Sequence, residues 1–285
     1  MPGHHLPYLA AAADGLFAEF GLDVDVLDPA SGPENVRRVA TGGSEFCLTS
    51  VGHYLTARER YGDLPARFVS AIVQRHPISG LVAAESDFRT PADLSGRRVG
   101  GSGSKGLLAE YQAALEHLGL DRGEVVETEY GAAPAALARG DIDALPDFID
   151  LVPRTSLQSG MPVRAVHFGI NAYGHGLVAG DIVDLETVRL MQDGLVAAIE
   201  RQRQDPTIGL DILARRYPDA DPGMAVDGWE MGEPGIFTGA PVGSSTPEGW
   251  ASTISFLVKA HGGAALAPES VYRPEAIRSP EEAHA

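Results

Sequence analysis

The spacing of hydrophobic residues alternates between a helical and a strand period along the first half of the chain. Residues 6–20 carry apolar side chains at helical spacing and are followed by Gly21, a residue type that commonly ends helices. Residues 22–27 then alternate between apolar and mostly acidic positions, as a half-buried strand does. The alternation continues to residue 148 and predicts an α/β protein in which helices pack on a mostly parallel sheet. Further strands are expected at residues 45–49, 68–74, 81–84, 98–100, 125–130 and 144–148, and further helices at residues 32–42, 54–61, 105–118 and 134–139.

The last third of the chain has a different pattern. Helices are predicted over residues 185–203 and 207–216, and beyond Pro218 the apolar residues, such as Trp250 and Leu257, keep the helical spacing. Helices with an apolar face must pack against something, and the sheet of the first part is the available surface. We therefore expect a discontinuous domain, to which the chain returns at its C-terminal end.

Length and composition narrow the class of protein. The chain has 285 residues, of which 44% are hydrophobic and 21% are charged, and this suits a globular protein of about two domains. Its net charge of −17 argues against a nucleic-acid partner, because no basic patch is available to neutralise phosphates. No apolar run approaches the ~18 residues of a membrane span. The single cysteine, Cys47, excludes an intrachain disulfide, a thiolate zinc site and an iron–sulfur cluster.

Five short motifs follow one another along the chain. They are Gly3-His4-His5-Leu6-Pro7-Tyr8-Leu9-Ala10, then Gly15-Leu16-Phe17 with Phe20-Gly21-Leu22-Asp23-Val24, then Arg38-Val39-Ala40-Thr41-Gly42-Gly43-Ser44-Glu45-Phe46, Thr90-Pro91-Ala92-Asp93-Leu94-Ser95-Gly96-Arg97-Arg98-Val99-Gly100 and Ala136-Leu137-Ala138-Arg139-Gly140-Asp141-Ile142-Asp143-Ala144. In this order and spacing they resemble the SsuA/Thi5-like family of solute-binding proteins. That family is typified by sulfonate, taurine and nitrate carriers and by the thiamine-pyrimidine precursor binder and synthase. The resemblance covers about residues 3–260.

The resemblance implies a type II periplasmic-binding-protein fold, in which two α/β lobes enclose a ligand and close about a hinge. We expect lobe 1 to comprise residues 1–84 and 179–285, and lobe 2 to comprise residues 85–178. Each lobe is then an α/β unit of its own. The ligand is expected in the cleft between them.

The beginning of the chain departs from the family pattern. Members of the family normally start with a strand that leads into the first motif, whereas only Met1, Pro2 and Gly3 precede that motif here. The start also lacks the basic residues and the long apolar stretch of a signal peptide. We hypothesise that the chain is cut short and that its first strand is missing. The protein is then expected to be extracytoplasmic, at the cell surface or in the periplasm; a chain complete as written would be cytoplasmic.

Candidate ligand contacts follow the carboxyl ends of the predicted strands, where open α/β sheets bind ligands. Tyr8 follows the position of the missing strand and could stack on a planar ligand; the alternative is packing within the first helix. Thr49, Ser50 and His53 follow the predicted strand residues 45–48. Their hydroxyls and imidazole suit polar ligand groups, although a lone histidine such as His53 can also be purely structural.

Lobe 2 and the return crossing supply the other candidates. Ser102 and Ser104 lie between a strand and the start of a helix, where backbone N–H groups and capping hydroxyls favour an anionic or polar group. The alternative is an ordinary N-cap without a ligand. The resemblance implies that Asp147 and Phe148 lie over the ligand as a polar and aromatic pair. The return crossing adds Asn171, Tyr173 and His175.

Three functions compete. The first, which we predict, is the solute-binding component of an ABC importer, a protein that performs no chemistry. The second is an enzyme similar to the pyrimidine synthase, whose Schiff-base lysine corresponds by resemblance to Thr49; Lys105 and Lys259 are the only lysines here. The third is an enzyme similar to the aryl-sulfinate desulfinases, with Cys47 as nucleophile. Its position inside a predicted strand is more typical of a small buried residue.

Charge also bears on the ligand and the partners. A net charge of −17 repels multiply charged anions at long range, so we expect a neutral, zwitterionic or singly charged organic solute. An aromatic or heteroaromatic, pyrimidine-like solute fits this, and a sulfonate held locally by Ser102 and Ser104 is the alternative. We expect no catalytic residue, no cofactor and no metal site. The expected partners are the small organic ligand and, for an exported protein, an ABC permease, with the protein itself a monomer.

Overall fold

The structure is a computed structural model, and it describes residues 5–101, 105–129, 131–237, 239–262 and 266–282. The strands are β1 (Phe46–Ser50), β2 (Ala66–Ala71), β3 (Ile78–Ala83), β4 (Arg98–Gly101), β5 (Glu124–Glu127), β6 (Leu145–Phe148), β7 (Val163–His167) and β8 (His175–Gly180). The α-helices are α1 (Leu6–Ala13), α2 (Gly32–Ala40), α3 (Val51–Tyr61), α4 (Lys105–His117), α5 (Ala133–Arg139), α6 (Val152–Ser159), α7 (Leu185–Gln204), α8 (Leu210–Arg216), α9 (Pro222–Ile236) and α10 (Pro247–His261). The 3₁₀ helices are η2 (Leu16–Phe20), η3 (Pro91–Leu94), η4 (Ile149–Leu151) and η5 (Pro268–Ser270).

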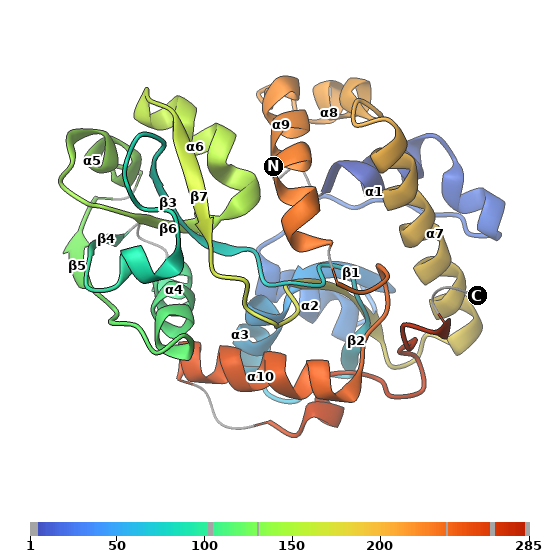
Figure 1. Cartoon of the computed structure of the whole chain (residues 1–285). Helices are drawn as coiled ribbons and strands as arrows, with labels where there is room; N and C mark the ends of the chain where they lie inside the picture. Colours follow the sequence, from blue (N-terminus) through green and yellow to red (C-terminus); the bar gives the residue numbers. More distant parts are fainter. Residues whose placement is uncertain (1–4, 102–104, 130, 238, 263–265, 283–285) are drawn as a thin grey trace.

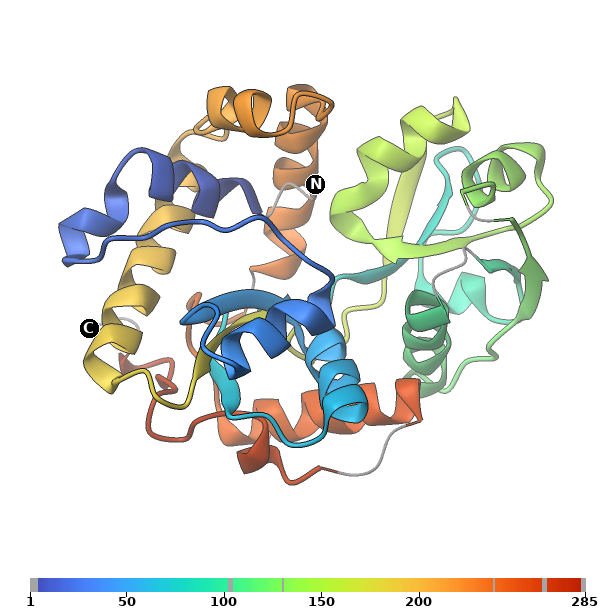
Figure 2. The same ribbon diagram turned by 180° about the vertical axis from the view of Figure 1, so that it is seen from behind.

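Figures 1 and 2 show two groups of strands, each flanked by helices. We call the part built on β1, β8 and β2 lobe 1, and the part built on β3 to β7 lobe 2. Helices α7 to α10 follow the return of the chain to lobe 1, as expected for a discontinuous domain. None of the described helices combines the length and the apolar character needed to cross a lipid bilayer.

β8 is the central strand of lobe 1 and runs antiparallel to both of its neighbours, β1 and β2. The helix α3 connects β1 to β2, so these two strands run in the same direction. β8 instead arrives from lobe 2 and enters the sheet from the opposite end. Its ladder with β1 places Thr49 opposite Gly176 and Ser50 opposite His175.

β3 has the equivalent position in lobe 2. It enters from lobe 1 and lies between β6 and β7, antiparallel to both. β4 and β5 pair in parallel, and a parallel bridge between Val99 and Ala144 places β4 beside the residue that precedes β6. The α/β class is confirmed, but the expected mostly parallel pairing is wrong. The strand that enters each lobe from the other one lies in the middle of its sheet and makes antiparallel ladders on both sides.

Two predictions near the beginning of the chain need correction. Residues 22–27 still alternate between half-buried and exposed positions, but no ladder pairs them with any described strand. Alternation gives a strand only where a neighbour satisfies its backbone groups, so the prediction of a strand there is wrong. The helix predicted over residues 6–20 is interrupted at Gly15, whose φ of 77° is left-handed; α1 ends before it and η2 follows.

The chain passes between the lobes at residues 72–77 and 168–174. These segments join β2 to β3 and β7 to β8, strands that belong to different sheets. We therefore propose these two crossings as the lobe boundaries, in place of boundaries near residues 84 and 179.

Helix α10 is a further connection between the lobes. It packs against α4 of lobe 2 and α3 of lobe 1, and both views show it running beneath the two lobes (Figures 1 and 2). Its Trp250 is fully buried, with the ring centroids of Phe68 and Tyr173 at 5.0 Å and that of Tyr272 at 5.7 Å. Tyr111 of α4 belongs to the same core cluster. A continuous apolar core therefore extends from one lobe to the other.

Candidate functional site

Four aromatic rings meet where the two lobes join. Phe148 ends β6, His175 begins β8, His76 lies in the first crossing and His5 directly precedes α1. The ring centroid of His175 lies 6.0 Å from that of His5 and 6.4 Å from that of Phe148. The ring of Phe148 lies 6.2 Å from that of His76, and all three pairs are edge-to-face. We call these four residues the ring cluster; it connects lobe 1, a crossing and lobe 2.

Asp147 directly precedes Phe148 in β6 and is half-buried. Its Oδ1 accepts the backbone N–H of Phe148 at 2.9 Å. Burial raises the pKa of this carboxyl to about 6, and the charge of Asp150 acts in the same direction, whereas the hydrogen bond from Phe148 opposes the rise. A donor on a ligand would compensate the ionised carboxylate for its lost hydration. Asp147 is therefore suited to accept an N–H or O–H group.

The end of β1 contributes two hydroxyl groups. The Oγ of Ser50 accepts the backbone N–H of His53 at 3.1 Å and caps α3. Thr49 is only 3% exposed, and its Oγ1 has no hydrogen-bond partner within the described part of the chain. A buried hydroxyl without a partner costs free energy, which makes the Thr49 hydroxyl a place for a water molecule or a ligand group. Ser50 lies opposite His175 of the ring cluster, and Thr49 lies opposite the next residue of β8, Gly176.

A buried carboxylate connects three elements beside the ring cluster. Glu110 of α4 is 8% exposed; its Oε1 lies 3.0 Å from Nε2 of His261, the last residue of α10, and its Oε2 lies 3.6 Å from Nε2 of His76. The Nδ1 of His76 accepts the backbone N–H of Ile78 at 3.4 Å, so the proton of the neutral imidazole is on Nε2 and faces Glu110. Burial lowers the pKa of His76, while Glu110 opposes that effect.

His53 lies close to the same carboxylate. Its imidazole packs so tightly on Gly32 that an added Cβ atom at this glycine would overlap the ring. The atoms packed around the ring lower the pKa of His53 by desolvation, Glu110 raises it and His261 lowers it. Among the described residues, no group of three or more histidine, cysteine, aspartate or glutamate side chains is arranged to hold a metal ion.

Tyr8 has surroundings that differ from those we expected of a ligand contact. The residue is 9% exposed and belongs to the core between α1, α7 and the lobe 1 sheet. Burial raises the pKa of its phenol. This matches the alternative of packing within the first helix. Ser102 and Ser104 lie outside the described residues.

The structure places Tyr173 and Asn171 on the side of the second crossing that faces α10. The ring of Tyr173 packs on Trp250, and its hydroxyl accepts the backbone N–H of Thr246 at 3.0 Å. Asn171 is exposed, and its carbonyl oxygen accepts the hydroxyl of Ser252 of α10 at 3.1 Å. Of the residues predicted from the sequence, Phe148 and His175 belong to the ring cluster. Ser50 pairs with His175 in the ladder of β1 and β8, and Asp147 directly precedes Phe148 in β6.

His76 and Glu110 were not singled out in the sequence. Each lies in a segment whose local pattern indicates only a loop or a helix, and their contact joins residues 34 positions apart across a lobe boundary. A single histidine in a loop and a single glutamate on a helix carry no spacing signal.

A groove of about 610 Å³ separates α6 of lobe 2 from α9 of lobe 1. Beside it, α9 packs against η4, the segment that directly follows Phe148. Gly232 of α9 approaches Asp150 so closely that an added Cβ atom would lie 2.9 Å from the Asp150 Cβ. The lobes are thus in contact at α9. The lining residues of the groove are Val152, Pro153, Ser156, Pro162, Val163, Met224, Asp227, Glu230 and Met231.

Comparisons with known proteins agree with this architecture. A formylaminopyrimidine-binding protein from Halalkalibacterium halodurans is 36% identical over 97 residues, which are 34% of this chain and 28% of that protein. A 4-amino-5-hydroxymethyl-2-methylpyrimidine phosphate synthase from Uromyces fabae is 24% identical over 147 residues, which are 50% of this chain and 41% of the synthase. The matching segments therefore span less than half the length of either relative.

A solved structure gives the fold. The periplasmic aliphatic sulphonate binding protein SsuA from Escherichia coli matches with a TM-score of 0.70 at 18% identity, over 98% of this chain and 90% of that chain. The predicted periplasmic-binding-protein fold is thereby confirmed. The model of the family described as NMT1/THI5 like matches residues 3–205, well over half of the chain. The resemblance found in the sequence is confirmed, and the chain belongs to the NMT1/THI5-like family.

Proposed function

We propose that this protein binds a small organic solute at the junction of its lobes and serves as the solute-binding component of an ABC importer. The ring cluster carries this proposal, because it is a chain of rings from lobe 1, lobe 2 and a crossing in which successive ring centroids lie 6.0, 6.4 and 6.2 Å apart. A ligand that contacts both lobes favours the arrangement in which they approach each other. Two of the similar proteins are binding proteins by description, which supports a binding function.

The chemistry of the site favours an aromatic or heteroaromatic solute with an N–H donor. The rings of His175 and Phe148 offer surfaces for a planar molecule, and Asp147 offers an acceptor beside them. An aminopyrimidine has both features, and one relative is described as binding a formylaminopyrimidine. The net charge of −17 disfavours a multiply charged anion. We therefore propose a pyrimidine-like solute ahead of a sulfonate.

An enzyme on the same fold is the second candidate, because one relative is a pyrimidine phosphate synthase. Two features of this chain oppose it. Burial raises the pKa of Cys47 to about 12, which disfavours the thiolate that a cysteine nucleophile requires. Thr49 occupies the position that the resemblance assigns to the Schiff-base lysine, and the ammonium group of Lys259 pairs with Glu116 at 3.4 Å.

The relatives also support a location and a partner. SsuA is described as periplasmic and as a binding protein for aliphatic sulphonates. We propose by analogy that this protein works outside the cytoplasmic membrane and delivers its solute to an ABC permease.

A thermal-shift screen of aminopyrimidines and alkanesulfonates tests the proposed function. A solute at a hundredfold excess over its Kd should stabilise the protein by about 2.7 kcal/mol. Mass spectrometry of the released solute should return it unchanged. A solute that is bound and returned chemically altered would establish the enzyme instead.

Substitutions locate the bound solute. Phe148→Ala should weaken binding at least tenfold, because it removes one ring of the cluster, whereas Asn171→Ala, in an exposed residue of the second crossing, should leave binding unchanged. Isothermal titration calorimetry of both variants measures this. A Kd unaffected by Phe148→Ala would place the solute away from the ring cluster.

A further inference from the structure

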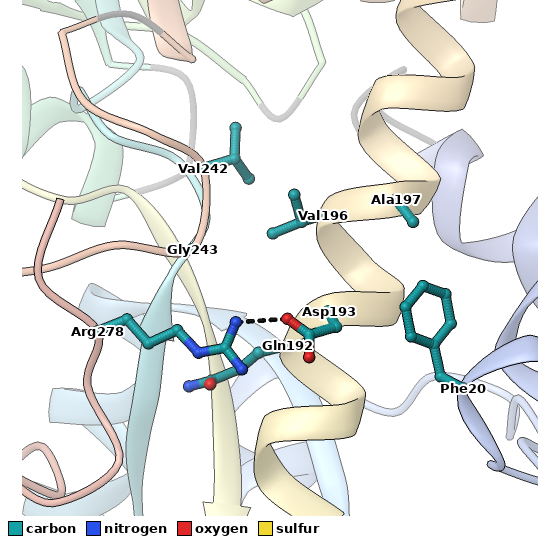
Figure 3. Close-up of a pocket in the computed structure, with 8 residues that line it drawn as sticks. All are labelled: Phe20, Gln192, Asp193, Val196, Ala197, Val242, Gly243 and Arg278. Carbon is teal, nitrogen blue, oxygen red and sulfur yellow. Dashed lines mark hydrogen bonds and ion pairs between the residues drawn. The ribbon is translucent and has the colours of Figure 1, made fainter. Parts of the chain in front are cut away.

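Lobe 1 contains a cavity that has no residue in common with the ring cluster. Its volume is about 280 Å³, and its walls come from α7, the end of η2, residues 242–243 and the segment around Arg278 (Figure 3). An apolar cavity of about 150 Å³ in another protein is large enough for benzene. The cavity in lobe 1 can therefore hold a substituted aromatic ring.

One end of the cavity is apolar. Val196 points from α7 towards Val242, and Ala197 lies on the side of the same helix that faces Phe20 (Figure 3). Val242 is 5% exposed, whereas Phe20, Val196 and Ala197 are half-buried. These side chains offer no hydrogen bonds, so this end favours the hydrocarbon part of a molecule.

The other end is polar and contains an ion pair. Figure 3 shows Gln192, Asp193 and Arg278 together at this end. The Nη1 of Arg278 donates to Asp193, and its Nη2 donates to the carbonyl oxygen of Arg189 at 3.3 Å. The two charges compensate each other, so a charged ligand would have to compete with an existing ion pair. The guanidinium group has five N–H donors, and these two bonds leave others for a ligand.

Gln192 has an acceptor that the protein leaves unused. The residue is 1% exposed, and its Nε2 donates to the carbonyl oxygens of Val69 at 2.6 Å and Ala276 at 3.0 Å. These two bonds fix the orientation of the side-chain amide and identify its other atom as the oxygen, Oε1. Among the described residues, Oε1 has no hydrogen-bond partner. Other buried polar atoms also lack a partner, but among them Gln192 is the residue that lines this cavity.

We propose that this cavity is a binding site for a small uncharged molecule with an apolar body and an amide-like head group. The N–H of the head group donates to Oε1 of Gln192, and its carbonyl oxygen accepts an N–H of Arg278. The apolar body lies among Phe20, Val196, Ala197 and Val242. The site is separate from the solute site at the ring cluster and does not depend on the function proposed for that site.

Benzamide is a probe with this chemistry, and acetophenone is its matched control. The two molecules have the same size and a carbonyl group, but acetophenone has no N–H donor. Ligand-observed NMR titrations of the full chain should show that benzamide binds and that acetophenone binds at least threefold more weakly, the factor expected for one hydrogen bond. Benzoate and benzamidine, which carry a charge, should also bind more weakly than benzamide. Equal affinities for benzamide and acetophenone would overturn the assignment of Gln192.

Two substitutions fill the cavity from α7 and serve as independent tests. Ala197→Phe and Val196→Phe should each weaken benzamide binding at least tenfold, with thermal melting used to show that the variant is folded. Leu157→Ala, at an exposed residue of α6 that belongs to neither site, should leave benzamide binding unchanged. Binding that survives in a folded filled variant, or that is lost in Leu157→Ala, would overturn the proposal. Because the two filling variants lie at different positions, one that fails to fold leaves the other as the test, and a crystal structure of the unsubstituted protein with benzamide gives a third.

Discussion

Two of the regions that join the lobes are built from opposite kinds of residue. Around α10 the junction is an aromatic and aliphatic core, in which Trp250 is fully buried among Phe68, Tyr173 and Tyr272. Around the ring cluster it contains titratable groups, including the buried Glu110 and His76. Apolar burial is the main source of folding free energy, whereas buried polar groups are stable only with suitable partners.

The difference shows where stability and ligand recognition lie in this fold. The aromatic core around Trp250 has little to offer a polar solute, because its rings are buried. The ring cluster region has hydroxyls, imidazoles and carboxylates that a ligand can contact, at the cost of desolvating them. Substitutions in the two regions should therefore have different effects on folding and on binding.

The largest effect is expected in the apolar region. Trp250→Ala should lower the free energy of unfolding by about 3–5 kcal/mol, because it removes a large side chain from a core shared by both lobes. Urea denaturation measures the loss. Leu157→Ala is the control: that side chain is 66% exposed, and its removal should change stability by less than about 0.5 kcal/mol. Similar losses for the two variants would contradict the role given to α10.

A smaller effect is expected at Glu110. Glu110→Ala should lower the free energy of unfolding by about 1–3 kcal/mol, because it leaves the buried ring of His76 facing no acceptor and frees His261 from α4. Glu110→Gln keeps an oxygen in place and should cost less. Denaturation of both variants at pH 7 makes the comparison. If Glu110→Ala and Glu110→Gln lower the free energy of unfolding by the same amount, the hydrogen bonds of this side chain do not contribute to stability.

Asp147 should affect stability in a pH-dependent way. Its pKa is raised to about 6 in the folded protein, so the folded state holds the proton more strongly than the unfolded state, and stability is lost as the pH rises from about 4 to 6. Asp147→Asn removes this loss. The variant should be more stable than the unsubstituted protein at pH 7, and the difference should shrink towards pH 4. Chemical denaturation at both pH values tests this, and a difference independent of pH would contradict it.

The smallest effect is expected at Cys47. Because burial raises the pKa of its thiol to about 12, a thiol reagent at pH 8 should react slowly with the native protein and rapidly in denaturant. Cys47→Ala should leave solute binding unchanged. Rapid labelling of the native protein would show an accessible thiolate and would support an enzyme with Cys47 as nucleophile.

The sequence predicted best the elements whose pattern is local. The helices near residues 32–42 and 105–118 and the strand that ends with Phe148 appear close to their expected positions, because amphipathic spacing and glycine at helix ends are local signals. β8 was not predicted. It is buried almost throughout and contains two glycines, so it lacks the alternation of a half-buried strand. Its identity as the central strand depends on partners more than 100 residues away.

The candidate site was predictable to a similar extent. Open α/β sheets bind ligands at the carboxyl ends of their strands. The residues at these ends of β1 and β6 are Thr49, Ser50, Asp147 and Phe148. The approach of His5 to His175 and of Glu110 to His76 is decided by how the lobes pack, which no local pattern records. Tyr8 and Tyr173 were predicted as ligand contacts from their positions in the chain. In the structure both side chains are buried in the core.

The course of α10 has a mechanical consequence. Two chain segments cross between the lobes, and in addition α10 packs on α4 of one lobe and on α3 of the other. A change in the angle between the lobes must therefore move α10 relative to α4 or to α3, a shear of packed helices rather than simple bending. Glu110 of α4 and His261 of α10 lie 3.0 Å apart at the first of these contacts. A shear between α4 and α10 would have to stretch or break this bond.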